Sequence, residues 1–284
     1  MVRHYYIDLG LKDVRVGFYD RFVFDADGIP MYPYETGAAY NITFVCHYAL
    51  YHLCLHQRFG RAGDLATFLK IADWVSRRGE ETHESFVFPY MYSWGGMEPP
   101  WISALGQGRL LSLFTRAHAL TGLDRYIDIA IKALHPFLHA VEDGGLKTRF
   151  PDGGIAWEEY PQDPPNIVLN GLITALVGIV DLAETGASDS ATDLFTEGLA
   201  GLESNLHRYD LGYWSAYDLA GRRRGPAPEA YHRYHVMQLW ALYEMTGKDT
   251  FRDVSRKWDS YGKGIRYHAH LAYSKTVRLL RLVR

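Results

Sequence analysis

Four glycines recur at a nearly constant interval along the chain, and this repeat limits the choice of fold. Gly60, Gly122, Gly186 and Gly247 are separated by 62, 64 and 61 residues, and each follows an apolar run with helical spacing. Glycine easily adopts the left-handed conformation in which many helices end. A polar gap and a second helical pattern follow each glycine, so the sequence predicts four helix–turn–helix units.

Helix pairs that repeat about every sixty residues form either an open solenoid or a closed α/α barrel. The connections between successive pairs distinguish the two, because three of them are long and contain glycine, proline and aromatic residues: Glu80–Pro100, Asp143–Pro165 and Tyr209–Tyr231. Loops of this kind build sites at one end of a toroid. We therefore predict a mainly α protein, an (α/α) barrel of about four helix pairs, with a superhelical binding protein as the alternative.

The two ends of the chain differ from the repeats. His4–Leu9 and Arg15–Asp25 alternate loosely and are rich in aromatic residues, which predicts short strands with a turn at Asp25–Gly28. We expect a β-hairpin arm over residues 1–38, a barrel domain over 39–267 and a basic amphipathic tail over 268–284. The arm suits a homodimer contact, and the tail suits a docked terminal helix, with a membrane-surface or partner-binding role as the alternative.

Composition excludes several classes of protein. The 284 residues are 48% hydrophobic and 22% charged, as in folded proteins with a sizeable core. The net charge of −3 disfavours nucleic-acid binding. Two cysteines, Cys46 and Cys54, cannot form a disulfide framework and suit a reducing compartment. No segment resembles a signal peptide, and no apolar run is long enough to span a membrane, so we expect a cytoplasmic protein.

Several chemistries lack their motifs. The pairs His232/His235 and His268/His270 do not have the spacing of metal ligands on one helix face. The sequence contains no glycine-rich phosphate loop and no G-x-S-x-G elbow, so we expect neither a metal nor a nucleotide. The aromatic content, with 21 Tyr, 13 Phe and 7 Trp, is compatible with a sugar-binding groove or with core packing.

Three segments carry the polar residues that could form a site. The first runs from Trp101 to Gly108 and includes Gln107, the second is Trp157–Pro161 followed by Asn170, and the third joins Tyr217 to Tyr231–His235. Arg222–Arg224 lies between Tyr217 and Tyr231 and suits an anionic substrate. Each segment also has a structural interpretation, as a helix start with small packing residues, a solvated acidic turn or a solvated basic loop.

These segments resemble the catalytic domain of the D-glucuronyl C5-epimerases, enzymes of heparan sulfate and heparin biosynthesis. The similarity rests on Trp-x-Ser-Ala-x-x-Gln-Gly, Trp-x-Glu-Tyr-Pro with Val-Leu-Asn-Gly, and Tyr-Asp-Leu followed by Tyr-His-x-x-His, in order between Tyr40 and Arg266. The resemblance implies an (α/α) barrel with β elements at its N-terminal side and an acidic polysaccharide, such as a heparosan-like polymer, as the substrate. It implies no metal for the residues that match.

The resemblance also implies roles for individual residues. Its catalytic positions fall on Glu159, Tyr160, Tyr217 and Tyr231. We further expect the substrate to contact a second set of side chains, which comprises Trp101, Gln107, Asn170, Arg222, Arg224 and His235. One departure affects the expected substrate, because the animal enzymes have Arg-His after Tyr-Asp-Leu where this chain has Ala220 and Gly221.

The reaction explains why these residue types are suitable. Epimerisation at C5 removes the hydrogen beside the carboxylate from one face of the sugar and returns a proton to the other, which needs two acid–base groups and donors for the developing negative charge. No hydride moves, so no redox cofactor is required. Two alternatives remain at this point: a polysaccharide lyase that expels the C4 substituent from the same carbanion, and a polysaccharide-binding protein without activity.

Overall fold

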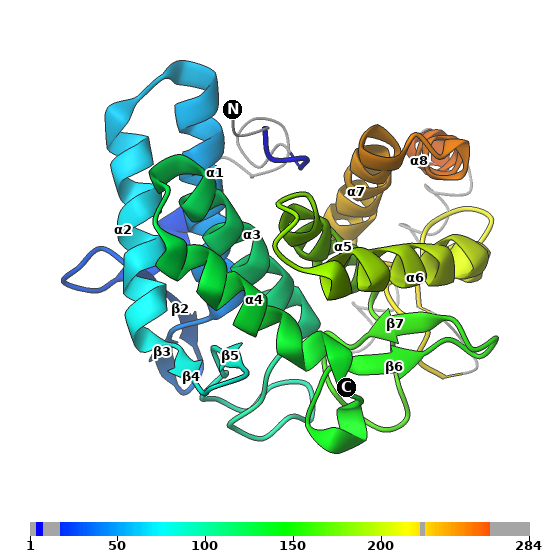
Figure 1. Ribbon diagram of the computed structural model, residues 1–284. Coiled ribbons are helices and arrows are strands. Elements are labelled where there is room, and N and C mark those ends of the chain that lie inside the picture. Colours follow the sequence, from blue (N-terminus) through cyan, green and yellow to red (C-terminus); the bar gives the residue numbers. More distant parts are fainter. Residues whose placement is uncertain (1–3, 8–17, 222–224, 262–284) are drawn as a thin grey trace, which may run out of the picture.

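The computed structural model describes residues 4–7, 18–221 and 225–261, and its main feature is a set of antiparallel helix pairs (Figure 1). The first helix of each pair packs against the second. In chain order the pairs are α1 (Ile42–Phe59) with α2 (Ala62–Arg78), α3 (Ala104–Thr121) with α4 (Asp124–Leu138), α5 (Leu169–Ala183) with α6 (Asp189–Asn205), and α7 (Glu229–Thr246) with α8 (Asp249–Tyr261). The predicted mainly α fold of four helix pairs is confirmed.

The first helices of the pairs form an inner row. α1 packs on α3, α3 on α5 and α5 on α7, while α2, α4, α6 and α8 lie outside them (Figure 1). The inner helices α3 and α5 are buried over most of their length, and α5 is apolar nearly all round. A helix with this character belongs between other layers rather than at the surface.

Three of the four repeated glycines end their helices as predicted. Gly60, Gly122 and Gly247 have φ of 68°, 70° and 69° and cap α1, α3 and α7. Gly186 also has a positive φ of 71°, but α5 already ends at Ala183. The difference arises because an additional turn follows this helix, in which the Gly186 N–H donates to the Ala183 carbonyl.

Glycines allow the central helices α3 and α5 to approach closely. A Cβ atom at Gly178 would lie 2.0 Å from the Gly108 carbonyl oxygen, and one at Gly108 would lie 2.7 Å from the Thr174 carbonyl oxygen. Real side chains cannot occupy these positions without moving a backbone. The small residues near Gln107 therefore serve contact between helix backbones.

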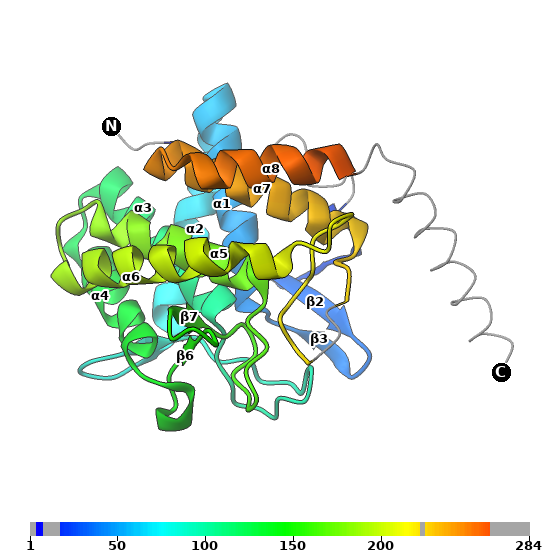
Figure 2. The same ribbon diagram turned by 90° about the vertical axis from the view of Figure 1, so that its right-hand side faces the viewer.

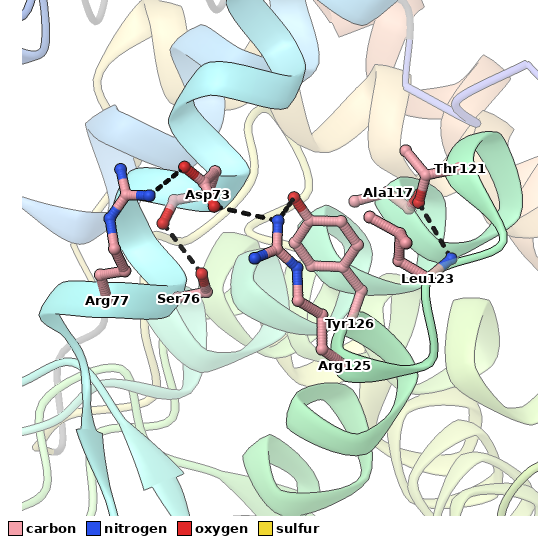
Figure 3. Close-up of polar contacts among 8 residues, drawn as sticks. All are labelled: Asp73, Ser76, Arg77, Ala117, Thr121, Leu123, Arg125 and Tyr126. Carbon is pink, nitrogen blue, oxygen red and sulfur yellow. Dashed lines mark hydrogen bonds and ion pairs between the residues drawn. The ribbon is translucent and has the colours of Figure 1, made fainter.

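Polar contacts tie the outer helices together. Arg125, at the start of α4, donates to the Asp73 carboxylate of α2 at 2.9 Å and to the Tyr126 hydroxyl, while Arg77 pairs with the same Asp73 (Figure 3). The turn between α3 and α4 is fixed beside them, since the Leu123 N–H donates to the Thr121 hydroxyl. Asp73 thus links two neighbouring pairs on the outer wall.

The N-terminal region forms a small antiparallel sheet that packs on α1. Its strands are β1 (Val23–Phe24), β2 (Pro30–Tyr34) and β3 (Gly37–Ala39), with Val23 opposite Met31 and Tyr32 opposite Ala39. The predicted turn at Asp25–Gly28 is present, and the Gly28 N–H donates to the Asp25 carbonyl. The predicted hairpin is therefore confirmed.

Of the two strands expected in this region, the first is wrong where the structure describes it, and the second is present among the described residues only at its C-terminal end, where Val23–Phe24 form β1. His4–Ile7 is not a strand; Tyr5 and Ile7 are buried in the helical core instead. Phe18–Arg21 is a 3-10 helix (η1). Alternating aromatic residues do not form a strand unless a neighbouring strand is available to pair with them. Here the buried members of the pattern pack against helices instead.

The long connections carry the remaining strands. β4 (Glu80–Glu81) pairs with β5 (Phe86–Val87), and β6 (Lys147–Arg149) pairs with β7 (Ile155–Trp157). Short 3-10 helices, η2 (Val141–Asp143) and η3 (Leu206–Tyr209), begin two of the connections. Figures 1 and 2 show β2, β3, β6 and β7 on the same side of the helices, which places the long connections at one end of the fold.

The predicted tail at 268–284 lies outside the described residues. In the part of the chain that the structure describes, no helix is long and apolar enough to cross a membrane.

Candidate active site

The acidic pair Glu158–Glu159 follows β7 in an extended segment, and its two side chains have different partners. The Glu158 carboxyl accepts the Ile167 backbone N–H at 3.2 Å and so holds the loop that precedes α5. The Glu158 carbonyl oxygen accepts the Ala104 N–H at the start of α3. This bracing by the neighbouring residue fixes the position of Glu159, whose side chain turns toward Asn170 instead.

Glu159 is a buried carboxyl group with few hydrogen bonds. It is 4% exposed and accepts one bond from the Asn170 amide at 3.2 Å. A Cβ atom at Gly171 would lie 2.6 Å from a Glu159 carboxyl oxygen, so α5 can approach this carboxyl only with glycine there. Burial raises the pKa of Glu159 to about 7, and its interactions with Tyr160 and Asn170 offset only part of that effect.

Three tyrosines extend from Glu159 in one series of neighbouring side chains. Tyr160 interacts electrostatically with Glu159 and with Tyr217, and Tyr217 interacts with Tyr231. The rings of Tyr217 and Tyr231 meet edge to face, with their centroids 5.0 Å apart. Burial, and then the nearby Glu159, raises the pKa of all three phenols, so they are protonated at neutral pH.

The four predicted catalytic residues are therefore neighbours, although they come from three separate segments. Glu159 and Tyr160 follow β7, Tyr217 lies in the connection after α6, and Tyr231 lies in the first turn of α7. Tyr231 is 40% exposed, whereas Glu159 is almost fully covered. The chain of hydroxyls thus leads from a buried carboxyl group to an accessible phenol.

Trp101 and Asn170, which we expect to contact the substrate, also lie beside this chain. The Trp101 ring stacks on Tyr90 at 4.2 Å between centroids and lies 6.0 Å from the Tyr160 ring. Its indole N–H donates to the Tyr92 carbonyl, which fixes the ring. The Trp101 side chain is half-buried. A fixed, partly open aromatic face of this kind suits stacking on a sugar.

Gln107 and His235 are held by protein groups away from the tyrosine chain. The Gln107 amide donates to the Phe86 and Ala133 carbonyls at 3.0 and 3.2 Å, which joins β5 to α4. The His235 ring is fully buried against the Ser215 hydroxyl at 2.9 Å, and burial lowers its pKa to about 3. Both side chains have structural partners, so we leave them out of the proposed substrate contacts.

Two further predicted residues, Arg222 and Arg224, lie outside the described residues. The segments on either side of them meet, since the Tyr217 N–H donates to the Gly225 carbonyl. Among the residues that the structure does describe, no three His, Cys, Asp or Glu side chains are grouped as metal ligands.

Sequence reasoning missed two charged residues of the interior. Glu158 was treated only as part of an acidic pair, yet it is the residue that braces the site. Arg109 on α3 was not considered, although it is the one charged residue between Ala104 and Phe114. A lone cation in an otherwise apolar helical run was the signal that could have identified it.

Comparison with known sequences points to one family. The profile of the family described as D-glucuronyl C5-epimerase C-terminus matches residues 81–260. An uncharacterised protein of Methanocaldococcus jannaschii is 35% identical over 177 residues, which are 61% of this chain and 55% of that protein. D-glucuronyl C5-epimerase of Caenorhabditis elegans is 31% identical over 186 residues, 60% of this chain and 30% of that protein. The chain thus matches about half of one curated relative and less than a third of the other.

Solved structures of carbohydrate-active proteins have a similar fold at low sequence identity. Cellobiose 2-epimerase from Spirochaeta thermophila has a TM-score of 0.58 at 10% identity and covers 87% of this chain and 66% of its own. A glycoside hydrolase family 76 mannosidase from Bacteroides thetaiotaomicron has a TM-score of 0.52 at 12% identity, covering 80% and 60%. These similarities establish the α/α toroid fold. Because the family profile spans more than half of the sequence, this chain belongs to the D-glucuronyl C5-epimerase C-terminus family.

Proposed function

We propose that this protein is a polysaccharide C5-epimerase that converts D-glucuronate to L-iduronate units. The observation that carries the proposal is the series of neighbouring side chains that leads from the buried Glu159 carboxyl past Tyr160 and Tyr217 to the exposed Tyr231. Family membership and the epimerase-like fold support a carbohydrate epimerase. The choice of glucuronate in an acidic polymer rests on the name of the relatives.

Glu159 is the proposed base. The C5 hydrogen of a uronate is a weak acid, and removing it requires a base whose pKa is not far below neutrality. Burial gives Glu159 a pKa of about 7, which is higher than that of an exposed carboxylate. Its ionised form takes the C5 proton and leaves an enolate that involves the sugar carboxylate.

Tyr231 is the proposed proton donor on the other face. Its raised pKa keeps the hydroxyl protonated, and its exposure allows contact with a bound sugar. Protonation of C5 by Tyr231 inverts the centre and leaves a phenolate, while Glu159 remains protonated. The hydroxyls of Tyr160 and Tyr217, which lie between them in the series, can return the proton from Glu159 to Tyr231, which restores both groups.

Paired substitutions test these roles. Glu159→Gln and Tyr231→Phe should each lower the turnover of a glucuronate polymer by about 100-fold or more, the usual scale for a general acid–base group. The matched controls are Glu197→Gln, an exposed carboxyl on α6, and Tyr243→Phe, farther along α7. Near-normal turnover in both site variants would refute the assignment.

A lyase would begin with the same proton abstraction. Expulsion of the C4 substituent produces an unsaturated uronate that absorbs in the ultraviolet, whereas reprotonation at C5 does not. We expect C5 exchange without any rise in that absorbance. A rise that follows the exchange would replace the proposed epimerase with a lyase.

A further inference from the structure

Arg109 is a buried cation whose donors are mostly unused. Its side chain lies on the inner helix α3, and the residue is 3% exposed. One guanidinium nitrogen, Nη2, donates to the Tyr234 hydroxyl at 2.9 Å. The other two, Nε and Nη1, have no hydrogen-bond partner among the described residues.

The described groups around Arg109 supply no negative charge. Its nearest titratable neighbours in the described part of the chain are Tyr234, Tyr5, Tyr19 and Cys46. Burial raises the pKa of Tyr5, Tyr19 and Cys46, so each of these groups is neutral at pH 7. A buried cation without a counter-charge costs several kcal/mol of stability.

A second arginine on the same helix shows how this protein compensates a structural cation. Arg116, two turns farther along α3, donates to both carboxyl oxygens of Asp181 at 2.7 and 3.0 Å. Both members of that pair are buried. Arg109 and Arg116 are thus equally covered, but only Arg116 has a carboxylate partner in the described structure.

The surroundings of Arg109 connect it to the tyrosine chain. Its hydrogen-bond partner Tyr234 lies one helical turn after Tyr231 on α7, and the two phenols are close enough to interact electrostatically. Tyr234 and Tyr19, which flank the guanidinium, are each only half-buried. Arg109 therefore lies behind two partly open tyrosines, next to the accessible end of the chain.

We propose that Arg109 binds a carboxylate of the substrate and thereby makes the site selective for acidic sugars. The identity of that carboxylate, a uronate unit of the polymer, rests on the proposed function. A carboxylate would supply the missing counter-charge and accept the donors at Nε and Nη1, and charge-assisted bonds of this type are the strong ones. In this role Arg109 selects and positions the substrate, while Glu159 and Tyr231 transfer the protons.

The test compares two ligands by calorimetry: a glucuronate-containing oligosaccharide and the same oligosaccharide with its carboxyl groups reduced to alcohols. The native protein should bind the acidic form at least about 30-fold more tightly, in the range measured for buried charge pairs. Arg109→Met should bring this ratio close to one. Arg109→Lys should lower it several-fold, because lysine has no planar fork of donors.

Thermal unfolding separates this role from a structural one. Arg109→Met should unfold at the same or a higher temperature than the native protein, because it removes an uncompensated buried charge. Arg116→Met should unfold at a lower temperature, since it leaves Asp181 unpaired. The exposed Arg233→Gln on α7 is the control and should change neither stability nor the binding ratio.

Three results would overturn the inference. One is a binding ratio that survives in Arg109→Met and Arg109→Lys. Another is a loss of stability in Arg109→Met as large as in Arg116→Met, which would indicate a carboxylate partner within this chain. The third is C5 exchange by the native protein with no preference for the acidic ligand, which would refute only the role of Arg109. A preference without exchange would refute only the proposed epimerisation.

Discussion

The carboxyl group of Glu159 and the hydroxyl group of Tyr231 are the two ends of one series of interacting side chains, with Tyr160 and Tyr217 between them. In the proposed mechanism, a proton that leaves one end is replaced from the other through the two intervening hydroxyls. For an epimerase this matters because each turnover moves a proton onto one group and off the other.

Removing the hydroxyl of one tyrosine in the chain should slow the step that restores the protonation states of Glu159 and Tyr231 more than it slows the chemical step. Tyr217→Phe keeps the ring beside Tyr231 but has no hydroxyl, so Glu159 and Tyr231 must regain their protonation states through solvent. We expect steady-state turnover to fall by about 10- to 100-fold, while the first turnover, measured by rapid quench, changes much less. Tyr243→Phe is the matched control. Equal losses in both phases would mean that Tyr217 acts in the chemical step itself.

The pH dependence of turnover should report the ionisation of Glu159. Since the carboxylate form is the base and its pKa is about 7, the rate should rise tenfold per pH unit below pH 7 and level off above it. The tyrosines stay protonated well above neutrality because their pKa values are raised. A rate that is flat from pH 5 to 8 would contradict this assignment.

The stability of the protein should depend on the same ionisation of Glu159. Turnover requires the ionised form, whereas folding favours the protonated form. Folding raises the pKa of Glu159 from 4.5 to about 7, so its contribution to stability is full below pH 4.5 and is lost as the pH rises to 7. Relative to the native protein, Glu159→Gln should therefore gain on the order of 3 kcal/mol of unfolding free energy between pH 4.5 and 7.5.

The comparison must be made as a difference between the two proteins, because buried histidines act in the other direction. Burial lowers the pKa of His232 to about 4 and of His235 to about 3, so their contribution is lost as the pH falls below 6.5. Both proteins contain these histidines, and their effect cancels in the difference. A difference in chemical denaturation that does not change with pH would show that the Glu159 pKa is not raised.

The close approach of α3 and α5 gives a prediction about folding alone. Gly178→Ala should destabilise the protein by about 3 kcal/mol, because the new methyl group would meet the Gly108 carbonyl. Gly63→Ala is the matched control on α2, where nothing lies near the new methyl group; it should be neutral or stabilising by up to about 1 kcal/mol. Equal effects of the two substitutions in urea denaturation would contradict this packing.

The helical fold could be predicted from the sequence because local residues within each repeat determine where its helices end. The glycines at 60, 122 and 247 end helices through a local requirement for positive φ, which needs no knowledge of the remaining chain. The N-terminal residues failed as predicted strands for the opposite reason. Tyr5 is fixed by helices that come more than a hundred residues later, among them α3 and α5, and no local pattern encodes that contact.

The site was predictable in part. The resemblance singled out Glu159, Tyr160, Tyr217 and Tyr231, and the structure brings these four side chains together. Gln107 matched the same motifs but is occupied by backbone carbonyls, because a motif residue can be retained for packing as well as for chemistry. Arg109 was missed because its significance lies in two buried donors without a hydrogen-bond partner among the described residues, which only the surrounding fold reveals.

Proton NMR in heavy water, with a glucuronate polymer as substrate, tests the central proposal most directly. The native protein should replace the C5 hydrogen with deuterium and produce iduronate signals, with no unsaturated uronate, and Glu159→Gln should do neither at a measurable rate. A native protein that leaves the C5 hydrogen in place on uronate polymers to which it binds would contradict the proposed function.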